Sequence, residues 1–158
     1  MEAEESRNPM IMLTLPEGDV RTLMNMLLVQ TVFDDFDLRS CTIQSFARFD
    51  IEGSSPEPEH SRPPFCKWQR LRPYVYNIIK GSQRPRFLKF VFSLSEKNLG
   101  DFEGARALFV NIIFDKNMVH LTTGASMNSF SLDRSVEGLW DSFVVNFLRG
   151  QGLNVSEE

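Results

Sequence analysis

The sequence has few cysteines and no long apolar run. Cys41 and Cys66 are too few for a disulfide framework or a four-cysteine zinc site, so we interpret both as ordinary thiols of an intracellular protein. The neighbouring Lys67 is expected to lower the pKa of the Cys66 thiol slightly. No stretch approaches the roughly 18 apolar residues of a membrane span, and the acidic residues 1–9 do not resemble a secretory signal. These absences predict a cytoplasmic protein that does not enter a membrane.

Recognised catalytic and cofactor-binding motifs are also missing. The chain has no glycine-rich phosphate loop followed by lysine and no GxGxxG turn. Its two histidines, His60 and His120, form no metal-binding pair. The cluster of Asp34, Asp35 and Asp37 lacks the glycine and the distant glutamate of a calcium loop, and we interpret it as a solvated turn. We therefore expect no catalytic residue, no metal site and no cofactor.

The length of 158 residues suits one domain. We expect a flexible acidic N-terminal tail over 1–9, a single domain over 10–150 and a flexible C-terminal tail over 151–158. Within the domain, residues 53–64 contain four prolines and almost nothing apolar. This composition predicts a mobile internal loop.

Three segments have apolar residues at helical spacing. The first covers residues 20–28, with Asp19 as its expected N-cap, and the second covers 68–80, with Gly81 at its end. The third follows Asp133 and ends at Gly150. Its apolar stripe is the clearest in the chain and consists of Val136, Leu139, Trp140, Phe143, Val144, Phe147 and Leu148.

Strands are predicted by alternation of apolar and polar residues. They cover residues 10–15, 36–51 (one strand, or two separated by a bulge), 87–94, 108–114 and 118–123, with a short strand around 130–132 after a bend at Gly124. Asp115, Lys116 and Asn117 suit a hairpin turn. Because runs of strands adjoin one another, the predicted fold is α+β. We expect a single domain with an antiparallel or mixed sheet and about three helices packed mainly on one face.

Charge is unevenly distributed along the chain. The net charge is −4, yet residues 62–89 contain eight basic side chains and no acidic one. Such a window is typical of an anion-binding surface, although folding can intersperse its charges with distant acids. Aromatic residues lie among these cations, as in surfaces that bind single-stranded nucleic acid. Since Tyr74 and Tyr76 point apart on a helix, we expect at least one of them, together with Trp68, to pack against the sheet.

The leading hypothesis is a non-enzymatic binding or adaptor domain that contacts an acidic protein or nucleic acid through residues 62–89. Carboxylate or phosphate pairing, or general attraction of anions, is expected from seven residues: Lys67, Arg70, Arg72, Lys80, Arg84, Arg86 and Lys89.

Two alternatives stay open. The first is a small enzyme that acts on a phosphorylated or otherwise anionic small molecule. The basic residues would clamp the substrate, with Asp34 or Asp37 as the base, which requires both groups to meet in one cleft. The second is an obligate subunit of a complex, which binds through exposed apolar surface and can also self-associate.

Several short motifs resemble those of a known family. They are Leu71-Arg72-Pro73, Ile79-Lys80-Gly81 before a phenylalanine-rich strand, Phe130-Ser131-Leu132-Asp133, and Trp140-Asp141. The chain resembles an uncharacterised family of small bacterial proteins, a domain of unknown function found mostly in anaerobic Gram-positive bacteria. The resemblance extends from about Met10 to Leu148 and implies a single bacterial cytoplasmic domain. None of the motifs is a catalytic signature, so the resemblance implies no activity and no functional residues.

Overall fold

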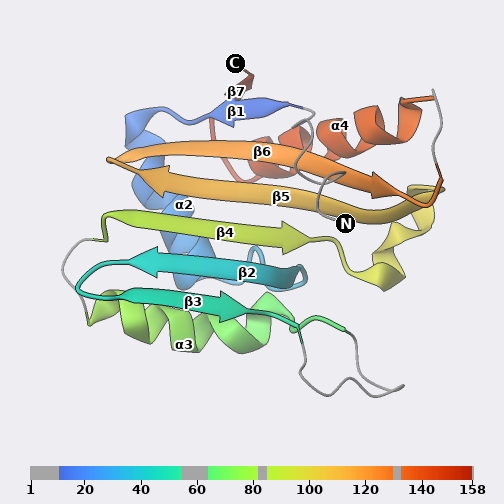
Figure 1. Ribbon diagram of the computed structural model, residues 1–158. Helices are drawn as coiled ribbons and strands as arrows, with labels where there is room; N and C mark the ends of the chain where they lie inside the picture. Colours follow the sequence, from blue (N-terminus) through green and yellow to red (C-terminus); the bar gives the residue numbers. More distant parts are fainter. Residues whose placement is uncertain (1–10, 55–63, 82–84, 130–132, 158) are drawn as a thin grey trace.

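A twisted antiparallel sheet dominates the computed structural model in Figure 1. The structure describes residues 11–54, 64–81, 85–129 and 133–157. These residues form seven strands: β1 (Met12–Thr14), β2 (Asp37–Gln44), β3 (Arg48–Glu52), β4 (Phe87–Ser93), β5 (Ala105–Asp115), β6 (Met118–Met127) and β7 (Ser156–Glu157). Their order across the sheet is β3-β2-β4-β5-β6-β1-β7, and all neighbouring strands are antiparallel.

Three longer helices in the described part of the chain lie on one face of this sheet (Figure 1). They are α2 (Val20–Leu28), α3 (Trp68–Lys80) and α4 (Ser135–Gly150), and two short 3₁₀ helices, η1 (Glu17–Asp19) and η2 (Glu96–Asp101), accompany them. Each longer helix turns an apolar stripe towards the sheet. The predicted fold, a single α+β domain with three main helices on one face, is confirmed. None of the helices described is both long and apolar enough to span a membrane.

Two buried tryptophans fix the helices to their neighbours. The Trp68 indole N–H donates to the carbonyl oxygen of Leu27 in α2 at 2.8 Å. The Trp140 indole N–H donates to the carbonyl oxygen of Phe109 in β5 at 3.0 Å. Both indoles are fully buried. Because a buried N–H without a partner would be costly, these two bonds help to set where α3 and α4 lie.

The other face of the sheet is covered by none of the described helices (Figure 1). The strand register places Ile113 opposite Lys89 on one side and opposite His120 on the other. These three side chains therefore share the uncovered face, whereas the flanking Val119 and Leu121 are buried in the core. The predicted orientation of His120, away from its two neighbours, is confirmed.

Residues 36–51 form a hairpin instead of one bulged strand. β2 and β3 pair so that Ile43 lies opposite Phe49 and Cys41 opposite Ile51. Residues that pair across a hairpin share a face of the sheet. Alternation of apolar and polar residues therefore looks the same in the sequence for a hairpin as for one long strand. The bend predicted at Gly124 is also wrong, since β6 continues to Met127. The strand predicted around 130–132 lies outside the described residues.

The flexible tail predicted over 151–158 is likewise wrong for residues 151–157. Leu153 and Val155 are buried in the core, and β7 pairs with β1. The Asn154 N–H donates to the Asp19 carboxylate at 2.8 Å, so that carboxylate binds the C-terminal segment instead of capping α2 with its side chain. Two separated apolar residues form too short a pattern to predict burial. The tail 1–9 and residues 55–63 of the predicted loop lie outside the described residues.

Candidate functional site

Helix α3 is the largest described element of the basic segment, and it packs against α2 and β2 near the edge of the sheet that β3 forms (Figure 1). Its outward side exposes 67% of Tyr74 and 37% of Tyr76. Arg70 and Lys80 are exposed on the same helix, and no residue of α3 is acidic. We call Arg70, Tyr74, Tyr76 and Lys80 the α3 outer surface.

The spacing of these four residues places each cation beside an aromatic ring. Arg70 precedes Tyr74 by four residues, and Tyr76 precedes Lys80 by four. The two residues of each pair are therefore about one helical turn apart. The Lys80 ammonium lies 5.5 Å from the centroid of the Tyr76 ring, within the range of a cation–π contact. The α3 outer surface is therefore both aromatic and positively charged.

The expectation that one of the two tyrosines packs against the sheet is wrong, whereas the burial of Trp68 is confirmed. The inner side of α3 is already filled by Trp68, Leu71, Val75, Ile78 and Ile79, all of which contact the core. Tyr74 and Tyr76 lie outside this inward stripe of the helix, and both are exposed.

Two of the predicted anion-binding residues are engaged within the fold. The Lys67 ammonium donates to the backbone oxygen of Asp35 at 3.2 Å and to the Ser95 hydroxyl at 2.9 Å. Arg72 forms a bidentate ion pair with Asp34, in which the side chains are only 18% and 10% exposed. These cations hold α3 against neighbouring loops and are not available to a partner.

The remaining predicted residues are dispersed. Arg86 is exposed just before β4, where its backbone N–H donates to the Gln44 carbonyl oxygen at 2.8 Å. Lys89 lies on the uncovered face of the sheet, and Arg84 lies outside the described residues. The structure thus leaves Arg70 and Lys80 exposed on α3, about 15 Å apart along the helix axis, and the other predicted residues are engaged within the fold or lie elsewhere.

The aspartate cluster is not the solvated turn predicted from the sequence. Asp35 is exposed, but Asp34 and Asp37 are buried, each with only 7% of the whole residue exposed. Burial raises the pKa of Asp37, an effect that the nearby Lys67 ammonium and the Ser95 hydroxyl oppose. The prediction was wrong because the basic partners come from residues 67–72, more than 30 positions away, and the sequence around the aspartates does not reveal these contacts.

A cavity of about 330 Å³ lies beside Asp37, and its charged lining consists of Asp37, Arg39, Lys67, Glu96, Lys97 and Arg106. Arg39 and Arg106 each lie where the strand register shifts. Such β-bulges redirect side chains, and they explain why both arginines enter this cavity. Sequence reasoning missed them because they lie outside the basic segment and alternation does not reveal a bulge. Among the described residues, no group of histidine, cysteine or acidic side chains is arranged to hold a metal ion.

Both cysteines are free thiols with suppressed acidity. Burial raises the pKa of Cys41 to about 12 and also raises the pKa of Cys66. The expected lowering of the Cys66 pKa by Lys67 is therefore wrong, because burial raises this pKa more than the nearby Arg70 guanidinium lowers it.

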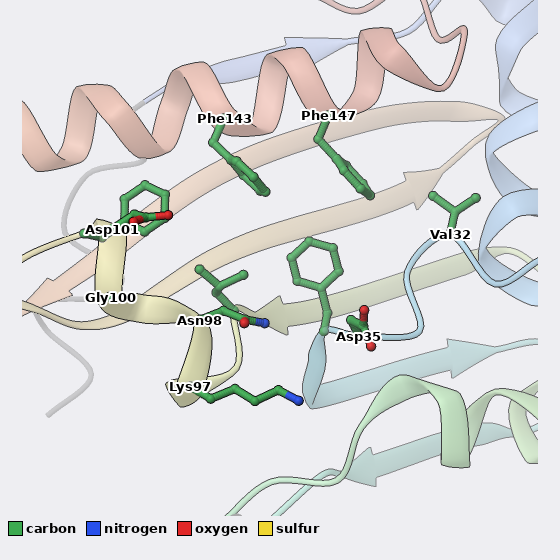
Figure 2. Close-up of a pocket in the computed structure, with 11 residues that line it drawn as sticks. Val32, Asp35, Lys97, Asn98, Gly100, Asp101, Phe143 and Phe147 are labelled. Atoms are coloured by element: carbon green, nitrogen blue, oxygen red, sulfur yellow. The ribbon is translucent and has the colours of Figure 1, made fainter.

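A second cavity, of about 500 Å³, opens between α4, η2 and the turn before β2 (Figure 2). Phe143 and Phe147 project into it from α4. The apolar stripe of α4 is wider than the helix can bury: Trp140, Val144 and Leu148 are buried, but Phe143 stays 40% exposed. That excess of apolar residues was the sequence signal for this cavity.

Comparison with known protein families places the chain in a family. The model of the family described as "Family of unknown function (DUF5721)" matches residues 26–156, a range that includes α3, α4 and both cavities. No curated protein and no solved structure matches the chain. The predicted resemblance to a domain of unknown function is confirmed, and the match assigns no activity.

Proposed function

The chain belongs to the DUF5721 family, whose function is unknown, and we propose that it is a non-enzymatic binding or adaptor domain whose α3 outer surface contacts an acidic partner. The observation that carries this proposal is the exposure of two tyrosines beside two cations on a helix without acids. We also propose that it acts in the cytoplasm, as its two free thiols support.

An acidic segment of a protein fits this surface better than a nucleic acid does. Tyrosine and arginine are, with tryptophan, the residues most enriched among those that contribute most of the binding energy at protein interfaces. Duplex DNA carries one charge per about 1.7 Å and is bound through many cations. Here Lys67 and Arg72 are engaged internally, Lys89 is on another face, and the whole chain has a net charge of −4.

Each residue of the surface has a specific role in this proposal. The planar guanidinium of Arg70 pairs with a carboxylate of the partner through two parallel hydrogen bonds. Tyr74 supplies a large apolar contact with few rotatable bonds, as well as a hydroxyl group. Lys80, which is placed against the ring of Tyr76, adds a second positive charge.

Fluorescence anisotropy with a labelled acidic peptide, made of glutamate and aspartate with interspersed leucine, tests the proposal at low and at physiological salt. The double variant Arg70→Glu/Lys80→Glu is expected to bind at least about tenfold more weakly, because two charge-assisted contacts are lost. The matched control is Lys89→Glu/Lys116→Glu, which makes the same charge change at exposed residues outside α3.

An equal loss in both double variants would show that only net charge matters and would contradict the proposal. Titration of labelled single-stranded DNA provides the second comparison. Tighter binding of DNA than of the peptide, with a log–log salt slope of about −0.7 for each phosphate neutralised and dependent on Arg70 and Lys80, would make nucleic acid the partner.

A second candidate function is an enzyme on an anionic small molecule at the cavity beside Asp37. The placement of Arg39 and Arg106 at bulges that turn them into this cavity supports it. Asp34 is already paired with Arg72, which leaves Asp37 as the candidate base. Thermal unfolding with inorganic phosphate tests this candidate: a concentration-dependent rise in Tm that Arg106→Gln abolishes would support it, and an unchanged Tm would contradict it.

A further inference from the structure

The lining given for the cavity between α4, η2 and the turn before β2 consists of described residues, none of which is next to an undescribed segment in the sequence. Its volume of about 500 Å³ falls within the range of roughly 300–1,000 Å³ that is usual for small-molecule sites. It shares no residue with the α3 outer surface, so it is independent of the proposed contact with an acidic partner.

The walls of the cavity are aromatic. Phe143 and Phe147 are stacked, with ring centroids 6.2 Å apart. The ring of Phe36 meets that of Phe147 edge to face at 5.6 Å, and the ring of Phe102 meets that of Phe143 in the same way at 6.1 Å. We call the cavity lined by Phe36, Phe102, Phe143 and Phe147 the phenylalanine pocket. The faces of such rings carry partial negative charge and attract cations.

The rim of the phenylalanine pocket carries polar side chains with no partner in the described part of the chain. Figure 2 shows Asp35 near Val32 on one side and Asp101 on the opposite side, with the two α4 rings above them. Lys97 extends along the edge that is farthest from the α4 rings. Asp35, Asp101, Lys97 and Asn98 make no side-chain hydrogen bond or ion pair with described residues. Two carboxylates against one ammonium leave the rim with a net negative charge.

We propose that the phenylalanine pocket binds a small organic cation with an apolar body, such as an arylalkylammonium or a quaternary ammonium compound. Ring faces and rim carboxylates both favour a positive group, whereas an anion would meet repulsion from both. The apolar body of the ligand displaces water from the phenylalanine side chains. Lys97 has a long flexible side chain and can turn to solvent when a cation enters.

Nuclear magnetic resonance with the isotope-labelled full chain tests this proposal, with benzyltrimethylammonium as the probe. We expect saturable shifts in the amides of residues 32–36, 97–102 and 143–147. The indole N–H of Trp140 should also shift, because its ring stacks on Phe143 at 5.4 Å. The indole N–H of Trp68, which packs against Phe90 and Phe92, is the internal control and should not shift.

Phenylacetate and benzyl alcohol are the matched anionic and neutral probes, and both should bind more weakly than the cation. The variant Asp35→Asn/Asp101→Asn should weaken binding of the cation by about tenfold. Glu52→Gln/Asp115→Asn removes the same charge from exposed positions elsewhere and should leave the affinity unchanged. Phe143→Leu keeps an apolar side chain but removes a ring, so it should weaken binding of the cation more than binding of benzyl alcohol.

Three results would overturn the proposal. The first is the absence of saturable shifts in the three segments, with the Trp140 indole unchanged. The second is equal or tighter binding of phenylacetate or benzyl alcohol, which would exclude a cation as the preferred ligand. The third is an equal loss in the Glu52→Gln/Asp115→Asn control, which would assign the effect to net charge instead of to the pocket.

Discussion

Arg72 in α3 and Asp34 in the turn before β2 form a bidentate ion pair, with Nε–Oδ1 at 2.9 Å and Nη2–Oδ2 at 3.0 Å. The Arg72 Nη1 also donates to the backbone oxygen of Val29 at 3.4 Å. The two residues are 38 positions apart in the chain. This pair therefore fixes the helix that carries the α3 outer surface against the segment that follows α2.

Removal of one partner of this pair should destabilise the fold. Arg72→Met is expected to lower the free energy of unfolding by about 1.5–3 kcal/mol, because the Asp34 carboxylate loses its hydrogen bonds to a charged group. The double variant with Asp34→Asn should lose less than the sum of the two single losses. Urea denaturation measures these values, and strictly additive losses would contradict the pairing. The control is the Arg48–Asp50 pair, whose side chains are 61% and 58% exposed. Arg48→Met should lower the free energy of unfolding by less than about 1 kcal/mol.

Trp140 should be among the most sensitive positions of the core. Trp140→Ala is expected to lower the free energy of unfolding by about 3–5 kcal/mol, since it leaves a large cavity in the core. Trp140→Phe keeps a ring and should cost less. An unchanged denaturation midpoint for the alanine variant would show that this side chain does not contribute to the core.

The C-terminal segment should contribute to stability through Leu153 and Val155. Truncation after Gly152 removes both buried side chains, each worth about 1.5–3 kcal/mol. Truncation after Val155 removes only the two exposed residues of β7 and residue 158, so it should cost little. Thermal unfolding of the two truncated chains provides the comparison, and equal Tm values for both would contradict the packing of this segment.

The stability of the protein should depend on pH through Asp37. Burial raises its pKa in the folded state above the ordinary value of 3.8, so the folded chain retains this proton at a pH where the unfolded chain has lost it. By linkage, the contribution of Asp37 to stability falls as pH rises from below 3.8 through the raised folded-state pKa. Wild type should therefore gain stability relative to Asp37→Asn as pH falls from neutral towards 4. A pH-independent difference between the two would contradict the burial of a titrating carboxyl group.

Local patterns in the sequence were sufficient for most of the fold. The hairpin between β5 and β6 is one example, since Lys116 and Asn117 adopt the positive φ angles of 53° and 68° that a tight turn requires. The boundaries of α3 were also predicted as the structure has them. In both cases the conformational preferences of the residues and the spacing of the apolar positions indicate the same helix or strand.

Long-range contacts account for what the sequence could not reveal. Nothing local in the sequence pairs Arg72 with Asp34 or Lys67 with Ser95, so the basic segment could not be divided into internal and exposed cations. The bulge at Arg39 depends on how β2 pairs with β4, which local alternation does not specify. The exposure of both tyrosines was also not predictable, because it depends on which residues of α3 face the core, and only the structure shows this.

Photo-crosslinking at position 74 tests the central claim most directly. Tyr74 is replaced by p-benzoylphenylalanine in the cells that make the protein, and Met118, which is 59% exposed at the start of β6, is replaced in the same way as the control. We predict that position 74 captures a protein through an acidic segment, and that Arg70→Glu/Lys80→Glu abolishes this product. The same products from position 118, or no product from position 74, would contradict the assignment of the α3 outer surface as the binding site.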